Sequence, residues 1–134
     1  FGDYKPTAIP SWLGINKNSS INGISPDTEV EASNQRSAAS PPNVQVMFTG
    51  NMAFADPSTR PPGSNVHPQA EVVWFTNQNG QATFNAGLTT WACNLVDTCA
   101  YSSVDEKSRT VMDEVTKDVV TLFSVRGIGS KLKN

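Results

Sequence analysis

Residues 71–86 read Glu-Val-Val-Trp-Phe-Thr-Asn-Gln-Asn-Gly-Gln-Ala-Thr-Phe-Asn-Ala. The pair Asn79-Gly80 separates two runs that are rich in β-branched and aromatic residues. Asn-Gly is the strongest short-range signal for a tight turn between antiparallel strands, because both residues accept a positive φ. This stretch therefore predicts a β-hairpin with strands at 71–76 and 81–86.

The sequence that follows predicts one long helix. Apolar residues recur at helical spacing and form a single stripe that would pack on a sheet: Val111, Met112, Val115, Val119, Leu122 and Phe123. Ser103 and Glu106 fit a capping box at the start of this helix, while Arg126 and Gly127 fit its end. Residues 87–100, between the hairpin and the helix, read as a turn region.

The N-terminal half predicts few regular elements. Residues 44–48, Val-Gln-Val-Met-Phe, form a clear strand, and residues 28–31 a short acidic one. The rest of 1–42 and the stretch 52–69 are rich in Pro, Ser and Asn, which predicts loops. The expected class is thus α/β, with an antiparallel C-terminal hairpin, one long C-terminal helix and a loop-rich N-terminal half.

Composition and charge exclude two classes of partner. The chain has 134 residues, about one domain, and 16% of them are charged, against about 25% in an average protein. The net charge is -2, and the ten Lys and Arg are scattered, whereas nucleic-acid binding needs clustered cations. No apolar run approaches the roughly 20 residues that cross a bilayer. We therefore expect neither a nucleic-acid partner nor a membrane span.

The two cysteines indicate a compartment. Cys93 and Cys99 are close enough in sequence to close a small disulfide loop, although two free thiols are the alternative. Together with the weakly charged composition, the pair predicts a secreted or extracellular protein. Asn18 begins the sequon Asn-Ser-Ser and would carry a glycan if the source is eukaryotic. Two cysteines and one histidine, without a Cys-x-x-Cys motif, argue against a zinc site, and no other metal site is predicted.

Few residues could carry chemistry. Glu29 and Glu31 would share one face of the strand at 28–31, where paired carboxylates can do acid–base work, or could equally form a solvated edge. His67 is the sole histidine and is either a binding residue or a solvated loop residue. Trp91 could help stack a sugar, or belong to the core. The candidates are thus Glu29 for catalysis and Glu31, His67 and Trp91 for binding.

One region resembles a known family. Residues 70–95 combine a hydrophobic strand, an Asn-Gly turn, the strand Thr-Phe-Asn-Ala-Gly and a Thr-Thr-Trp motif before the final helix. This order resembles the C-terminal end of the N,N-dimethylformamidase large-subunit family, from about residue 12 to 123. The resemblance implies a partial flavodoxin-like sheet in which residues 1–134 are a single segment, the C-terminal part of a larger glutamine-amidotransferase-like domain. An upstream polypeptide or second subunit would then supply the remaining strands.

The resemblance also implies amide C–N hydrolysis with an iron held by tyrosines and a carboxylate. Tyr4 and Tyr101 match no ligand motif of that site, so no cofactor is identified in this chain. Glu29 is carried over as a carboxylate that lines the pocket. The cysteine pair departs from the family pattern and suggests a secreted relative. The expected function is structural support in a secreted amide hydrolase whose catalytic residues lie mostly upstream.

Two other functions remain open. The chain could be an extracellular binding or structural module that contacts a glycan or a protein through the loop 52–69 and exposed tryptophans. It could also be an independent small hydrolase that uses the acidic cluster around Glu29.

Overall fold

The structure is a computed structural model and describes residues 2–24, 41, 43–51, 69–87, 90–99 and 103–124. These ranges contain five strands and two helices: β1 Gly2–Pro6, β2 Ile21–Ile24, β3 Gln45–Asn51, β4 Gln69–Thr76, β5 Ala82–Asn85, α1 Trp91–Leu95 and α2 Glu106–Ser124. The fold is therefore mixed α/β, with the sheet dominant.

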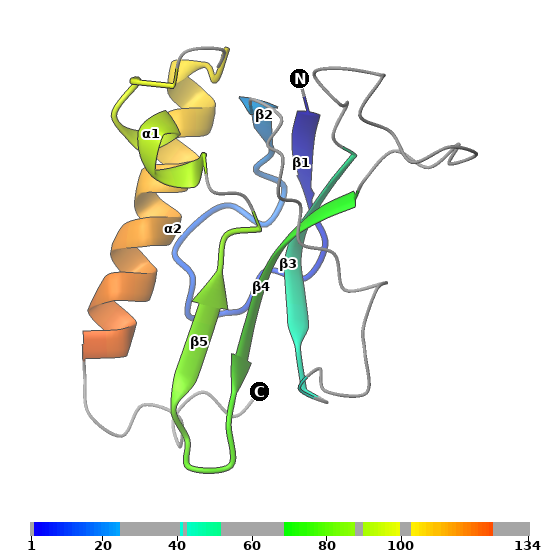
Figure 1. Ribbon diagram of the computed structural model, residues 1–134, viewed down its shortest axis with the longest axis vertical. Coiled ribbons are helices and arrows are strands. Elements are labelled where there is room, and N and C mark those ends of the chain that lie inside the picture. The colour runs from blue at the N-terminus through cyan, green and yellow to red at the C-terminus, as the bar shows by residue number, and fades with distance from the viewer. Residues whose placement is uncertain are drawn as a thin grey trace.

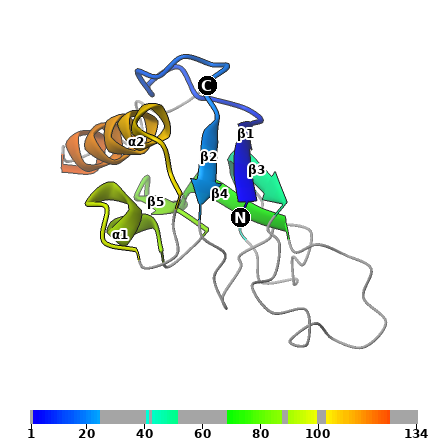
Figure 2. The ribbon, with the colours of Figure 1, turned by 90° about the horizontal axis from the view of Figure 1, so that it is seen from above.

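The five strands form one sheet in the order β2-β1-β3-β4-β5, and all neighbours pair antiparallel. The sheet curls like half a barrel, and both helices lie on one side of it (Figures 1 and 2). The α/β class, the antiparallel hairpin and the long C-terminal helix are confirmed. The sheet differs in strand direction from the mostly parallel, flavodoxin-like sheet that the resemblance implies.

The hairpin of β4 and β5 pairs Trp74 with Phe84. Its loop is organised by Asn77, whose Oδ1 accepts hydrogen bonds from the backbone N–H groups of Asn79 and Gln81, both at 2.9 Å. Gly80 takes the left-handed conformation, with φ of +72°. The Asn-Gly turn is thus present, and the side chain of Asn77 adds the hydrogen bonds that end the two strands at 76 and 82.

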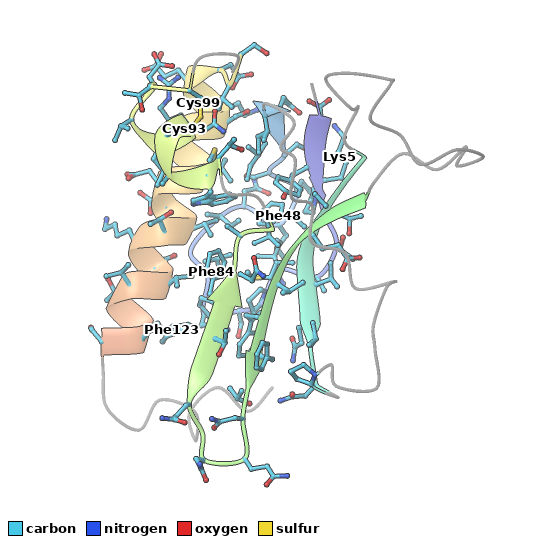
Figure 3. All side chains as sticks on the ribbon, in the orientation of Figure 1. Lys5, Phe48, Phe84, Cys93, Cys99 and Phe123 are labelled. Carbon is cyan, nitrogen blue, oxygen red and sulfur yellow. A yellow bond between two sulfur atoms is a disulfide. The ribbon has the colours of Figure 1, made fainter. Side chains whose placement is uncertain are left out.

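The core lies between α2 and the curled sheet. The predicted apolar stripe of α2 is confirmed, since Val111, Met112, Val115 and Val119 are buried and Leu122 and Phe123 pack against the core. Figure 3 shows Phe48, Phe84 and Phe123 between the sheet and α2. Burial of one such aliphatic side chain contributes roughly 1.5–3 kcal/mol, so packing, rather than the helix propensity of its valines, holds α2 in place.

The start of α2 differs from the predicted capping box. The helix begins at Glu106, and the Oδ1 of Asp105 accepts the N–H of Ser108 at 2.7 Å, which makes Asp105 the cap. Ser103 instead donates its backbone N–H to Gly23 O at 3.1 Å. Ser108 Oγ accepts the N–H of Asn22 at 2.9 Å. The first turn of α2 is thereby joined to β2, and Asp105, two residues after Ser103, takes the capping position.

Three elements occur where the sequence predicts loops or turns. β1 and β2 lie in the predicted N-terminal loop region, and α1 lies in the predicted turn region 87–100. β1 is short and begins with Gly2 and ends with Pro6, residues that weaken a strand signal. It is nevertheless a central strand, because β2 and β3 pair with it on either side. The predicted strand at 28–31 and the predicted helix end at 126–127 lie outside the described residues.

Candidate functional site

The chain after β5 passes very close to β4, at what we call the Gly87 junction: Tyr4, Glu71, Ala86 and Gly87. Gly87 has φ of +76°, and a Cβ built on it would lie 2.8 Å from the carbonyl carbon of Glu71 and 3.0 Å from the hydroxyl of Tyr4. Asn85 Oδ1 accepts the N–H of Gly87 at 2.7 Å. Only glycine fits this backbone conformation and this approach.

Tyr4 closes the junction from β1. Its side chain is fully buried, and its hydroxyl donates a hydrogen bond to Ala86 O at 3.1 Å. Burial raises the pKa of Tyr4 well above its usual range, and the nearby charge of Glu71 raises it further. Tyr4 is thus held as a neutral phenol that can donate a hydrogen bond but resists ionisation.

Glu71 is the buried carboxyl residue of the described part, at 6% exposure. Strand register places Lys5, Thr49 and Glu71 in one row across β1, β3 and β4. Strands lie about 4.8 Å apart, so Lys5 and Glu71 are two strand spacings from one another at the backbone. Thr49 Oγ1, between them, shares a hydrogen bond of 2.9 Å with Thr7 Oγ1. The row combines a cation, hydroxyls and a carboxyl residue across three neighbouring strands.

Beyond the junction, the chain forms what we call the disulfide cap: α1 together with residues 96–99. Cys93 in α1 is bonded to Cys99, with the two Cα atoms 5.0 Å apart. The predicted disulfide is confirmed. Arg109 of α2 donates to Asp97 Oδ1 at 2.7 Å and to the carbonyl oxygens of Val104 at 3.2 Å and Asn94 at 3.3 Å. The cap is therefore fastened to α2 through Arg109 at its C-terminal end.

Trp91 fastens the other end of the cap. Trp91 is 7% exposed, and its Nε1 donates a hydrogen bond to Thr116 Oγ1 at 3.0 Å. Its ring packs edge-to-face against the ring of Phe84, with the ring centroids 6.3 Å apart. The rings of Trp12 and Trp74 pack edge-to-face with their centroids 5.3 Å apart. Among the described residues, neither buried Nε1 atom has a hydrogen-bond partner. Since Trp74 and Trp91 are core residues, the tryptophans of the described ranges form no exposed stacking platform.

The remaining predicted residues have varied placements. Glu29, Glu31 and His67 lie outside the described residues, so their roles stay predictions. Asn18 is exposed in the connection between β1 and β2, where its backbone N–H donates to Asn16 Oδ1 at 2.9 Å. Its glycosylation also stays a prediction.

The described residues do not fit the iron site that the resemblance implies. They contain no group of three or more His, Cys, Asp and Glu residues placed to hold a metal. Tyr4, the tyrosine they include, is engaged with Ala86 O and has a raised pKa, whereas a tyrosine ligand binds iron as the phenolate.

Sequence reasoning missed Tyr4, Glu71 and Arg109. Tyr4 lies in a strand that was not predicted, so nothing placed it beside Gly87. Glu71 was assigned to a strand, but burial of a carboxyl residue depends on what covers that strand. The sequence spacing of Asp97 and Arg109 predicts their ion pair only weakly, because the two residues meet only when the disulfide cap has folded.

Comparisons with known proteins identify no relative, because no protein-family model, curated protein or solved structure matches the chain. Within the part of the chain that the structure describes, no helix is long and apolar enough to cross a membrane.

Proposed function

We propose that this chain is a structural segment of a secreted, N,N-dimethylformamidase-like amide hydrolase, and that it supports a catalytic site completed by upstream sequence. The proposal rests on the resemblance of residues 70–95, together with the contacts that the residues of this region make. Glu29 would line the pocket as a carboxylate, and most catalytic residues would come from elsewhere.

One observation carries the proposal: several residues of the motif that resembles the family make contacts with other parts of the same chain. Asn85 accepts the N–H of Gly87, Gly87 packs against Glu71, and Trp91 donates to Thr116. Motif residues that make such contacts hold the backbone of the segment in place, which is a structural role rather than reaction with a substrate. Support for a neighbouring site fits these contacts better than catalysis by the motif itself.

The same contacts bear on the binding-module alternative. A glycan platform needs exposed aromatic rings, yet Trp74 and Trp91 are buried at 2% and 7% exposure. Exposed valines, Val96 and Val120, are single residues on separate elements and are normal for a protein surface. We therefore favour the supporting role.

The test compares the natively secreted protein with the isolated 134-residue chain. We expect the native material to contain additional polypeptide by intact mass and to release dimethylamine from N,N-dimethylformamide or a related N,N-dialkyl amide. The isolated chain should fold, as judged by circular dichroism, but release none. Hydrolysis by the isolated chain would refute the supporting role, and absence of amide hydrolysis by the native material would refute the reaction class.

A further inference from the structure

The chain contains two Asn-Gly pairs, Asn22-Gly23 and Asn79-Gly80, and the fold places them in different surroundings. Asparagine is a chemically labile residue, and a following glycine has no side chain to hinder attack on the asparagine amide by its own backbone nitrogen. Asn79-Gly80 lies in the loop between β4 and β5, whereas Asn22-Gly23 lies within β2. The two pairs share the same local chemistry, so the structure decides which of them reacts.

The pair in the hairpin loop is held only by a residue of the same loop. Asn79 is exposed, and the loop lies at the end of the hairpin, at the bottom of Figure 1. The backbone N–H of Gly80 donates to Asn77 O at 3.0 Å, and the backbone N–H of Asn79 donates to Asn77 Oδ1 at 2.9 Å. A local opening of the loop therefore frees the Gly80 nitrogen while β4 and β5 stay paired.

The pair in β2 is held by two other elements. The backbone N–H of Gly23 donates to Asp3 Oδ1 on β1 at 3.0 Å, and Gly23 O accepts the N–H of Ser103 at 3.1 Å. The backbone N–H of Asn22 donates to Ser108 Oγ in α2 at 2.9 Å. Attack by the Gly23 nitrogen on the Asn22 side chain therefore requires β2 to move away from β1 and from the start of α2.

We propose that Asn79 is a site of spontaneous deamidation in the folded protein, and that the fold protects Asn22 from the same reaction. The Gly80 nitrogen gives up its proton to base and attacks Cγ of Asn79. A C–N bond forms, the bond from Cγ to the amide nitrogen breaks, and ammonia leaves, which produces a five-membered succinimide. Water then opens the ring at either carbonyl and gives aspartate or isoaspartate. The net change is the loss of ammonia and the gain of water.

The reaction changes the charge of the hairpin loop. Residues 77–81, Asn-Gln-Asn-Gly-Gln, carry no charged side chain, and the whole chain has a net charge of -2. Each conversion adds one negative charge, so the product separates from the parent chain by ion exchange. This modification is independent of the proposed amide hydrolysis, because it needs only the chain and water.

Incubation of the whole folded chain in mildly alkaline buffer, followed by peptide mapping with mass spectrometry, tests the proposal. We expect Asn79 to convert roughly tenfold faster than Asn22 or more, because the bond from Gly23 to the Asp3 carboxylate is stronger than the neutral bond from Gly80 to Asn77. In concentrated urea, which removes the fold, the two asparagines should convert at similar rates.

Two variants are matched controls. Asn79→Gln should abolish the conversion in the hairpin peptide and leave the slow conversion of Asn22 unchanged. Asp3→Ala removes the acceptor of the Gly23 N–H and should accelerate conversion of Asn22 without changing that of Asn79. Equal rates at Asn22 and Asn79 in the folded chain would overturn the proposal. A folded chain in which Asn79 stays intact for as long as both asparagines need to convert in urea would also overturn it.

Discussion

Substitution of Gly87 by Ala should be among the most damaging single-methyl changes in the chain. Gly87 has φ of +76°, which costs an L residue about 1–2 kcal/mol. The new Cβ would also lie 2.8 Å from the carbonyl carbon of Glu71, whereas carbon atoms in contact lie about 3.5–4.0 Å apart. β4 and the chain after β5 must therefore separate.

That separation breaks a hydrogen bond as well. The bond from Tyr4 to Ala86 O spans the Gly87 junction at 3.1 Å. Its loss costs about 1 kcal/mol. Added to the backbone term, this loss gives a decrease of about 2–3 kcal/mol in the free energy of unfolding.

Gly80→Ala is the matched control. Gly80 has nearly the same φ, +72°, but lies in the turn at the far end of the β4–β5 hairpin (Figure 1). It should lose only the backbone term, about 1–2 kcal/mol. Urea unfolding followed by tryptophan fluorescence measures both variants. A Gly87→Ala variant that is no less stable than Gly80→Ala would refute the close approach of Gly87 to β4, while one that fails to fold where Gly80→Ala folds would support it.

Three further variants test neighbouring features. Tyr4→Phe should lose about 1 kcal/mol of unfolding free energy at neutral pH. Because the folded pKa of Tyr4 is raised, the wild type should also lose stability relative to this variant as pH rises above about 10, the unfolded pKa. A stability difference that stays constant in unfolding titrations from pH 8 to 11 would contradict this. Asp105→Ala should accelerate hydrogen exchange in the first turn of α2 more than Ser103→Ala does. Hydrogen bonds from Ser108 lower the pKa of Asp105, so the cap should persist above about pH 4 and weaken as pH falls through the lowered pKa. Cys93→Ser with Cys99→Ser should reduce the free energy of unfolding by about 2 kcal/mol in urea titrations, and no loss would contradict a stabilising disulfide.

The hairpin and α2 could be predicted because their signals are local. Asn79-Gly80 fixes a turn within a few residues, and the stripe from Val111 to Val119 repeats over a single helix. The disulfide was predictable for the same reason, since Cys93 and Cys99 are neighbours in sequence.

β1, β2 and α1 could not be predicted because distant residues stabilise them. Tyr4 pairs with Gly50 of β3, and β2 is joined to the start of α2 through Asn22 and Ser108. α1 is held by Trp91 and the disulfide rather than by helix propensity. The Gly87 junction could not be predicted for the same reason, because Tyr4 contacts it only when β1 pairs within the sheet.

Interstrand nuclear Overhauser effects in the folded chain test the sheet on which this account depends. We predict contacts from residues 3–6 to residues 48–51, together with contacts from the Tyr4 ring to Ala86 and Gly87. Residues 3–6 without interstrand contacts, or a Tyr4 ring exposed to solvent, would contradict the sheet order, the Gly87 junction and the supporting role proposed for the segment.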